Sequence, residues 1–329
     1  MAKVSVVIPL FNRGHLISRA LNSLCAQDFD DWEAIVVDDG SSDDGPEIVK
    51  EFIRKDQRIR LVRRSREPKG PSCCRNIGAE NSIGKYLIFL DSDDELAKHC
   101  LSTRYQYMES RPDLDLAVFP LESFSETPGD KGEIFNTYCE HPDDYLHLFL
   151  QDKAPWQTTC PVWKKEFYLQ IGGFNEDFLV KTDPELHARA LLLHHPKFEV
   201  VKTIPDCHYR INHHDEVKRS YFNEAAVLYR VKFLKHANTW IQDLSNEKSI
   251  LQQDLNVAFL SLYRHYMIAS IKDFRELYFD TLKWGRAQNL VSAWNHRLLH
   301  WIGKASISES SMFRKLRLVG ICYKLLYLN

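Results

Sequence analysis

The first 120 residues alternate between short apolar segments and amphipathic segments, and this alternation restricts the fold more than any other feature of the sequence. Continuous β-branched runs are typical of strands buried in a parallel sheet, whereas apolar residues at intervals of three and four are typical of helices. Strand, helix and strand at this spacing predict βαβ units, with helices on both faces of the sheet. The predicted strands are residues 4–10, 32–37, 59–62, 86–90 and 114–119, and the predicted helices are residues 13–27, 46–53, 71–82 and 98–110.

The second part of the chain has a different pattern. Residues 121–160 are mixed, and beyond them the sequence predicts helices at 166–171 and 184–194 and strands at 198–203 and 207–211. From about residue 216 onward the strand signals disappear and the chain is rich in Leu, Trp and Tyr at helical spacing. We therefore predict an α/β domain over residues 1–215 and an α-helical region over residues 216–329.

Composition and missing motifs exclude several functional classes. The formal net charge is −2, which gives the whole molecule no strong attraction for nucleic acid. No Gly-x-Gly-x-x-Gly follows the first strand and no P-loop sequence occurs, so the usual dinucleotide and P-loop signatures are absent. The eight cysteines have no Cys-x-x-Cys spacing, and no apolar run reaches the ~18 residues of a spanning helix. Scattered cysteines and the lack of a signal peptide lead us to expect a cytoplasmic protein.

Acidic side chains collect where the predicted strands end. Ligands of open parallel sheets bind outside the carboxyl ends of the strands. In an extended segment Asp91 and Asp93 point the same way, which suits two oxygens facing one hard divalent cation, with positions left open for a diphosphate. A solvated turn is the alternative for a single Asp-x-Asp, but its place after a buried strand favours the metal. The polar residues at these ends are Asn12, Asp38, Asp39, Asp91, Asp93 and Asp94.

An arginine near a helix start is the candidate partner for the phosphates. Arg75 lies in the segment 70–78, on a predicted helix whose N-terminus favours anions. A surface position for Arg75 is an equally good interpretation of the spacing alone.

These motifs together resemble the nucleotide-sugar domain of glycosyltransferase family 2, whose members are inverting enzymes of GT-A fold. The resemblance is strongest over residues 3–120 and weaker to about residue 215. It implies a nucleotide-sugar half over residues 1–120, an acceptor half over residues 121–215, and a helical C-terminal extension. The segments that carry it are Val6-Val-Ile-Pro-Leu-Phe-Asn12, Val36-Val-Asp-Asp-Gly-Ser-Ser42, Cys74-Arg-Asn-Ile-Gly78 and Phe89-Leu-Asp-Ser-Asp-Asp94.

The resemblance also implies roles for individual residues. Pro9, Asn12 and Asp39 would line the nucleoside pocket. Arg75 would contact the donor phosphates or ribose. Asp91 would lie by the ribose, Ser92 would be among the residues that bind the nucleotide-sugar, and Asp93 would ligate Mn²⁺ or Mg²⁺.

The family's second half carries a Gly-Gly-Phe segment followed by the catalytic base, and here Gly172–Phe174 leads to Asp183. The sequence departs from the usual pattern at Thr182, where an acid is common, and at Pro184, where an aromatic residue is common. Glu185 or Asp177 could therefore replace Asp183. A plain capping role is a further alternative, because Asp before Pro is a strong helix start.

Two further segments carry weaker signals. The family often has a mobile loop where this chain has residues 208–219, so His213, His214 and Arg210 could contact the metal or the phosphates, although a solvated basic loop explains the pattern equally well. Residues 312–328 mix basic and apolar residues and suit either an interfacial membrane helix or, preferably, packing onto the catalytic domain.

The prediction is thus a metal-dependent glycosyltransferase. It would move a sugar from a nucleotide-diphosphate donor, with a uridine nucleotide favoured, to a hydroxyl of an acceptor glycan or glycolipid, with inversion and with Asp183 as the base. Transfer to a polyprenyl phosphate and a non-catalytic scaffold of the same fold are the alternatives. We expect no nucleic-acid partner, and a lipid-linked acceptor would favour peripheral contact with the membrane through the C-terminal helices.

Overall fold

The computed structural model describes residues 2–211, 224–244 and 248–307. The chain divides into two compact units. The first comprises Met1–Tyr145 and Ala154–His213, and the second comprises Leu146–Lys153 and His214–Asn329. The predicted domain boundary between residues 215 and 216 lies outside the described residues and stays a prediction.

The first unit is built on a mostly parallel sheet, as predicted. Among the described residues seven strands form this sheet, in the order β10-β6-β9-β4-β1-β2-β3, and only β9 runs antiparallel to its neighbours. The centre of the sheet is dry, because every residue of β2 and β4 is buried. The strands are β1 (Val4–Leu10), β2 (Trp32–Asp38), β3 (Ile59–Arg63), β4 (Tyr86–Phe89), β6 (Leu116–Val118), β9 (Pro161–Lys164) and β10 (Phe198–Val200).

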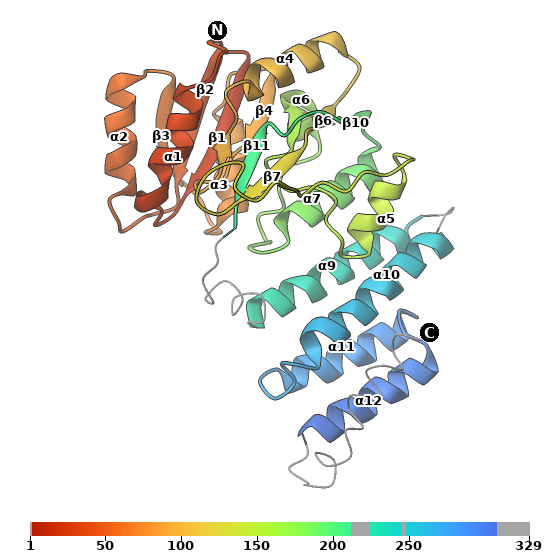
Figure 1. The fold of residues 1–329 in the computed structure, drawn as a ribbon. Coiled ribbons are helices and arrows are strands. Elements are labelled where there is room, and N and C mark those ends of the chain that lie inside the picture. The colour runs from red at the N-terminus through yellow and green to blue at the C-terminus, as the bar shows by residue number, and fades with distance from the viewer. Residues whose placement is uncertain (1, 212–223, 245–247, 308–329) are drawn as a thin grey trace. The chain divides into compact units, whose positions relative to one another are not determined.

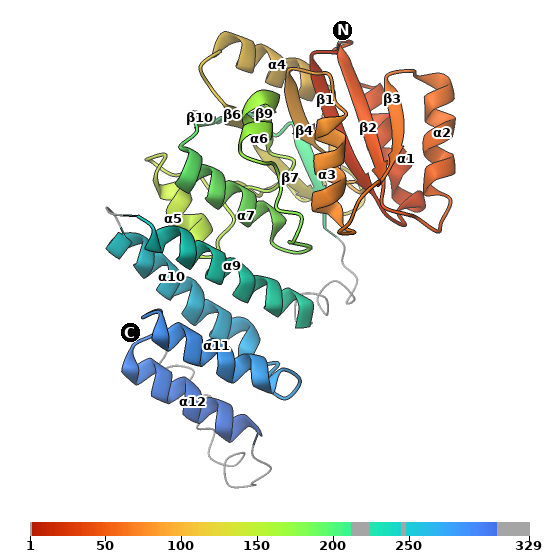
Figure 2. The ribbon, with the colours of Figure 1, turned by 180° about the vertical axis from the view of Figure 1, so that it is seen from behind.

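Helices cover both faces of this sheet (Figures 1 and 2). The helices α1 (Gly14–Cys25) and α2 (Gly45–Lys55) follow β1 and β2 and pack together on one face. The helix α3 (Pro71–Glu80) lies on the opposite face against β1 and β2. The change of face between α2 and α3 accompanies the move of the chain from β3 at one edge to β4 beside β1. A ligand crevice is expected at such a reversal of strand order.

Residues 121–165, for which the sequence predicted no element, contain three strands, β7, β8 and β9, and the two longer ones shape the sheets. β9 inserts between β4 and β6, and β7 (Leu121–Phe124) joins a second, four-stranded sheet in the order β5-β11-β7-β8. Both are only four residues long, too short to show a period in the sequence. The other strands of the second sheet are β5 (Glu95–Leu96), β8 (Glu133–Ile134) and β11 (Cys207–Arg210).

The remaining elements of the first unit are helical, and α4 and α6 pack on the interior strands β6 and β9. The predicted helix at 184–194 begins two residues earlier, at Thr182, and its last turn is π-helical. These elements are α4 (Cys100–Ser110), α6 (Lys165–Gln170), α7 (Thr182–Arg189) and η1 (Ala190–His194); α5 (Asp144–Leu150) crosses the boundary between the units.

The second unit is helical over its described residues, as predicted. Two buried tyrosines join its helices, because Tyr263 Oη donates to the carbonyl of Tyr278 at 2.6 Å and Tyr278 Oη donates to the carbonyl of Leu299 at 2.7 Å. No helix among the described residues has the length and apolar character that crossing a membrane requires. Its elements are α9 (Glu224–Gln242), α10 (Lys248–Leu262), η2 (Tyr263–Met267), α11 (Arg275–Ala287) and α12 (Ala293–Ile307).

Candidate functional site

The loops that follow β1 and β2 are joined by hydrogen bonds at the carboxyl end of the sheet. Asn12 has a left-handed backbone (φ 51°), its amide N–H donates to Ser41 Oγ at 3.1 Å, and its Oδ1 accepts from the Ser42 amide at 2.8 Å. Pro9 lies within β1, opposite Val37 of β2. The residues predicted to line the nucleoside pocket therefore lie close together, at the carboxyl ends of β1 and β2.

Asp39 has a basic partner that the sequence did not single out. Arg64 donates from Nε to Asp39 Oδ1 at 2.5 Å and from Nη1 to the carbonyl of Arg66 at 2.5 Å. A polar pocket of about 420 Å³ opens next to this pair, lined by Gly40, Arg63, Arg64, Ser65, Arg66 and Glu67. Three arginines at the end of β3 and just after it, Arg63, Arg64 and Arg66, thus line this pocket.

Arg75 is buried in the site rather than exposed on the surface. Its side chain is 5% exposed, and Nη2 donates to Asp91 Oδ1 at 2.6 Å. Burial opposes the charge, but the carboxylates of Asp91 and Asp183 together raise the pKa of the guanidinium. Arg75 therefore carries a fixed positive charge at the end of β4.

Asp93 and Asp94 follow in the same turn but have different surroundings. Burial, and then the charge of Asp91, raise the pKa of the Asp93 carboxyl. Asp94 is fully buried, and its Oδ1 accepts from the amide of Arg210 at 3.0 Å. Burial raises the pKa of the Asp94 carboxyl well above its usual range, with the charges of Asp91 and Asp93 adding to the effect. Asp94 therefore holds the turn, while Asp93 is the carboxylate placed beside Asp91.

The turn at residues 91–94, which carries three aspartates and is called the acidic turn below, fits a divalent cation that takes most of its ligands from a bound diphosphate. Nowhere in the described parts of the chain do three or more His, Cys, Asp or Glu side chains converge on a point that could hold an ion. Mg²⁺ and related ions are often held by one or two carboxylates together with substrate phosphates. Asp93 and Asp91, crowded with like charge, match that pattern.

Arg210 braces the acidic turn from β11. Its Nε donates to the carbonyl of Asp93 at 3.2 Å, and its Nη1 donates to the carbonyl of Ser125 at 2.7 Å. The residue is 8% exposed, so it is a fixed part of the site wall. A phosphate contact by Arg210 stays a prediction, and His213 and His214 lie outside the described residues.

Asp183 lies in the first turn of α7, within electrostatic reach of Arg75. Its carboxylate accepts from the Thr158 amide at 3.1 Å, from the Thr158 hydroxyl, and from Thr182 Oγ1 at 3.1 Å. Thr182 Oγ1 in turn accepts from Arg75 Nη1 at 3.5 Å. Residues 75, 91 and 183, remote in sequence, therefore belong to one site.

The capping interpretation of Asp183 is wrong. The residue before the helix is Lys181, with a left-handed backbone (φ 64°), and no side chain caps this end of α7. Asp183 is one residue inside the helix, and its carboxylate is engaged by Thr158 instead. Of the alternative bases, Glu185 is fully buried and accepts from Arg189 Nε at 2.8 Å, so it faces away from any substrate.

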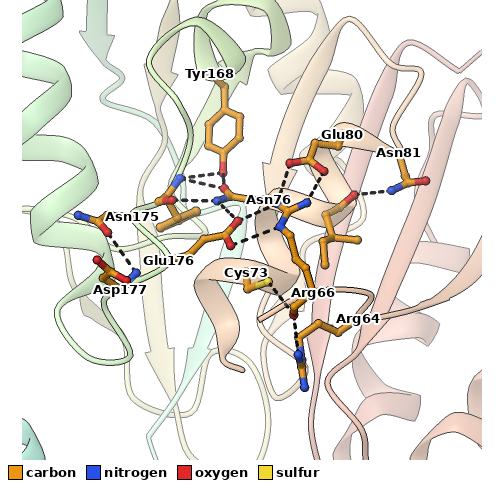
Figure 3. A network of polar contacts seen from close by, with 12 residues as sticks. Arg64, Arg66, Cys73, Asn76, Glu80, Asn81, Tyr168, Asn175, Glu176 and Asp177 are labelled. Carbon is orange, nitrogen blue, oxygen red and sulfur yellow. Dashed lines mark hydrogen bonds and ion pairs between the residues drawn. The ribbon is translucent and has the colours of Figure 1, made fainter. Parts of the chain in front are cut away.

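A network of polar contacts fixes the segment that leads to α7 (Figure 3). The buried amide of Asn76, next to Arg75, donates to the carbonyl of Phe174 at 2.8 Å and accepts from its N–H at 2.9 Å. Asn76 also donates to Glu176 Oε1 at 2.9 Å, and Arg66 joins Glu176 to Glu80 because its Nη2 donates to Oε1 of each at 2.7 Å. Spacing in the sequence could not reveal this network, because Asn76 lies 98 positions from Phe174 and Arg66 lies 110 positions from Glu176.

Gly173 is the tightest point of this network, and it has a matched control in Gly172. Both have a left-handed backbone, with φ of 62° and 78°, but a Cβ on Gly173 would lie 2.5 Å from Asn76 Oδ1, while one on Gly172 would meet nothing within 4 Å. We expect Gly173→Ala to lower the free energy of unfolding by about 2–4 kcal/mol and Gly172→Ala by about 1 kcal/mol. Urea unfolding of both variants measures the difference, and equal losses would contradict the clash.

His187 couples the stability of the α7 region to pH. Its ring is buried and stacks on Trp163 at 5.5 Å with an interplanar angle of 4°, and burial lowers its pKa to about 3. In the unfolded chain the His187 ring binds a proton near pH 6.5, whereas in the folded protein it stays neutral down to about pH 3. The stability that depends on a neutral His187 is therefore complete above pH 6.5 and is lost as the pH falls from 6.5 toward 3.

Because of His187, we expect the free energy of unfolding to be about 1 kcal/mol lower at pH 5.5 than at pH 7. His187→Phe keeps an aromatic ring against Trp163 but cannot take up a proton, so the loss over this range should shrink by that amount. Urea unfolding at both pH values measures it. An identical loss in the variant would show that other groups control the acid response.

Comparisons with known proteins agree with the predicted family and fold. The family model described as Glycosyl transferase family 2 matches residues 5–163. A GalNAc(5)-diNAcBac-PP-undecaprenol beta-1,3-glucosyltransferase of Campylobacter jejuni is 42% identical over 106 residues, which are 32% of this chain and 34% of the relative. The uncharacterized glycosyltransferase YibD of Escherichia coli is 36% identical over 201 residues, 59% of this chain and 53% of the relative. The chain thus spans between a third and about half of the length of these two relatives.

A solved structure extends the likeness of fold to nearly the whole chain. The crystal structure of Staphylococcus aureus TarS, residues 1–349, in complex with UDP-GlcNAc matches with a TM-score of 0.69 and 18% identity, covering 98% of this chain and 92% of the other. This likeness confirms the predicted α/β fold of GT-A type with C-terminal helices.

Proposed function

We propose, from the premise that residues 5–163 form a glycosyl transferase family 2 domain, that the chain is an inverting glycosyltransferase. It moves a sugar from a uridine-diphosphate donor to a hydroxyl of an acceptor glycan or glycolipid. The proposal rests mainly on Arg75, because its guanidinium donates both to Asp91 of the acidic turn and to Thr182 at the start of α7.

The donor lies along the carboxyl ends of the strands. Pro9, Asn12 and Asp39 face the nucleoside, and Asp39 accepts from the base once it is released from Arg64. Asp91 and Ser92 lie by the ribose. Arg75 of α3 contacts the phosphates, since a buried and permanently charged guanidinium beside the acidic turn matches a diphosphate.

Asp93 is the carboxylate assigned to Mn²⁺ or Mg²⁺. When bound, the ion would neutralise charge that develops on the leaving diphosphate. The burial and like-charge crowding at Asp93 support this assignment, because both effects favour a compensating cation.

Asp183 serves as the general base. A sugar hydroxyl is a weak nucleophile, and a carboxylate within hydrogen-bond reach can take its proton as it attacks the anomeric carbon. Thr158 and Thr182 hold the carboxylate in one orientation, and Arg75 stabilises the charge on the departing diphosphate from the other side. With Glu185 turned into the core, a second carboxylate for a double displacement is lacking among the described residues of α7, which favours inversion.

The names of similar proteins favour one class of donor and one class of acceptor. The TarS structure holds UDP-GlcNAc, and the Campylobacter relative is named for an acceptor sugar on undecaprenyl diphosphate. These names support a UDP-sugar donor and a glycan or lipid-linked acceptor for this chain.

The test is transfer itself. Purified protein would be incubated with individual UDP-sugars, Mn²⁺ and a panel of acceptor glycosides, with release of UDP and the anomeric configuration of the product followed by NMR. UDP release that requires an acceptor, with an inverted product, supports the proposal. A retained configuration would contradict the assignment of a single base, and no release with any donor would contradict the activity.

A further inference from the structure

The helix α12 presents a stripe of alternating aromatic and basic side chains. Trp294 is 61% exposed and Trp301 37% exposed, and Arg297 and Lys304 between and beyond them are also exposed. The spacing of three, four and three residues places all four side chains on one side of the helix. None of the fifteen residues of α12 is acidic.

A groove runs beside this stripe, between α11 and α12. Its volume is about 540 Å³, and of the described residues that line it one, Asp280, is acidic. Basic side chains from both helices line it together with apolar ones. The basic and imidazole residues are Arg275, Lys283, His296, His300 and Lys304, and the apolar residues are Phe279, Leu282 and Ile307.

The groups around His296 also show an excess of positive charge on this face. Burial lowers the pKa of His296, and His300, Arg286 and Arg297 lower it further. No acidic side chain is among the groups that act on it in the described structure. The face thus carries more positive than negative charge, with Asp280 as the one acidic residue among the described lining residues of the groove, and an anionic partner would balance the excess.

We propose that this face of α12, with the adjoining groove, docks the protein on the surface of an anionic phospholipid bilayer. Tryptophan rings favour the headgroup level of a membrane, and Lys and Arg close to the surface are attracted by acidic lipids. Trp294 and Trp301 enter the interface, while Arg297 and Lys304 lie against lipid phosphates. The groove receives a headgroup at Arg275 and Lys283 and apolar contact at Phe279 and Leu282.

A bilayer fits this face better than a nucleic acid does. Single strands bind along extended basic grooves, whereas here the basic residues stand next to exposed tryptophans and an aliphatic groove, on a chain of net charge −2. The inference goes beyond the proposed function and does not rest on it, because docking needs neither nucleotide nor acceptor.

The test is co-sedimentation of the full-length protein with vesicles of phosphatidylglycerol and phosphatidylcholine, against phosphatidylcholine alone. We expect binding to the anionic vesicles only, weakened by 0.5 M salt. We expect Trp294→Ala/Trp301→Ala and Arg297→Glu/Lys304→Glu each to reduce the partition coefficient by about tenfold or more. These four side chains are exposed, so the variants should keep the unfolding temperature of the wild type, which calorimetry checks.

Two controls match these variants in number and kind. Ile250→Ala/Val257→Ala removes two exposed apolar side chains of α10, and Arg54→Glu/Lys55→Glu makes the same change of net charge on α2. Both should bind vesicles like the wild type. Absence of binding, equal binding to neutral vesicles, or equal losses in the controls would each overturn the proposal. Preferential binding of a single-stranded oligonucleotide, lost in the α12 variants, would assign the face to nucleic acid instead. Nucleotide titration of the same variants separates this result from failure of the proposed function, since their donor binding should be unchanged.

Discussion

Asp183→Asn should slow sugar transfer by about 10²- to 10⁴-fold, the range that loss of a positioned general base usually costs. The variant keeps the shape of the side chain, and its Oδ1 can still accept from the Thr158 hydroxyl. It loses only the hydrogen bond from the Thr158 amide to Oδ2, so α7 should stay folded. Donor affinity should change little, because the base acts on the acceptor hydroxyl. Steady-state kinetics and UDP titration measure the two effects separately.

The matched control is Asp177→Asn, at an exposed acid of the segment before α7. It should transfer sugar at nearly the rate of the wild type. If Asp177→Asn lost as much activity as Asp183→Asn, the base would have to be reassigned. An unchanged rate in Asp183→Asn would point to an acceptor that needs no base, such as a polyprenyl phosphate.

Arg104→Met is expected to lower the free energy of unfolding by about 3–5 kcal/mol, because it leaves a buried charge without its partner. Arg104 and Asp206 are both at most 1% exposed and share two hydrogen bonds of 2.8 and 2.6 Å. Burial opposes the charge on Arg104, but the Asp206 carboxylate raises the pKa of the guanidinium well above its usual range. Denaturant unfolding of the variant measures the loss.

A double variant shows how much of the lost unfolding free energy comes from the unpaired charge and how much from the ion pair itself. Arg104→Met/Asp206→Leu removes both charges and should recover much of the stability lost in Arg104→Met. Arg111→Met, which breaks the exposed pair of Arg111 with Glu199, should cost at most about 1 kcal/mol. If the double variant were no more stable than Arg104→Met, lost packing rather than the unpaired charge would explain the effect.

The pair matters for the site because Asp206 directly precedes β11. That strand ends at Arg210, whose amide holds Asp94 and whose side chain holds the carbonyl of Asp93. Loss of the pair should therefore also weaken the brace behind the acidic turn.

Local patterns in the sequence were enough to predict most of the first sheet. β1 was predicted to the residue, and β2, β3, β4 and α3 to within two residues, because buried β-branched runs and their stop signals are local properties. The strands β7 and β9 could not be predicted in this way. They are stabilised by pairing with strands that lie far away in the chain, as β9 is by β4 and β6.

The site shows the same limit. The acidic turn after β4 could be placed from its own residues, but the partners that fix its neighbours come from remote segments. Arg75 reaches α7 across 107 positions, and Asn76 binds Phe174 across 98. Such contacts depend on tertiary packing, which spacing in a sequence does not encode.

Calorimetric titration of UDP, GDP and dTDP, each with Mn²⁺ and with a chelator, tests the central assignment most directly. We expect UDP to bind tightly only with the metal, and we expect Asp93→Ala to reduce this affinity at least tenfold, about as much as the chelator does for the wild type. Binding that is equal with and without metal would contradict the role of Asp93. No binding of any nucleotide under either condition would mean that the site holds no donor, and the chain would be a scaffold of the same fold.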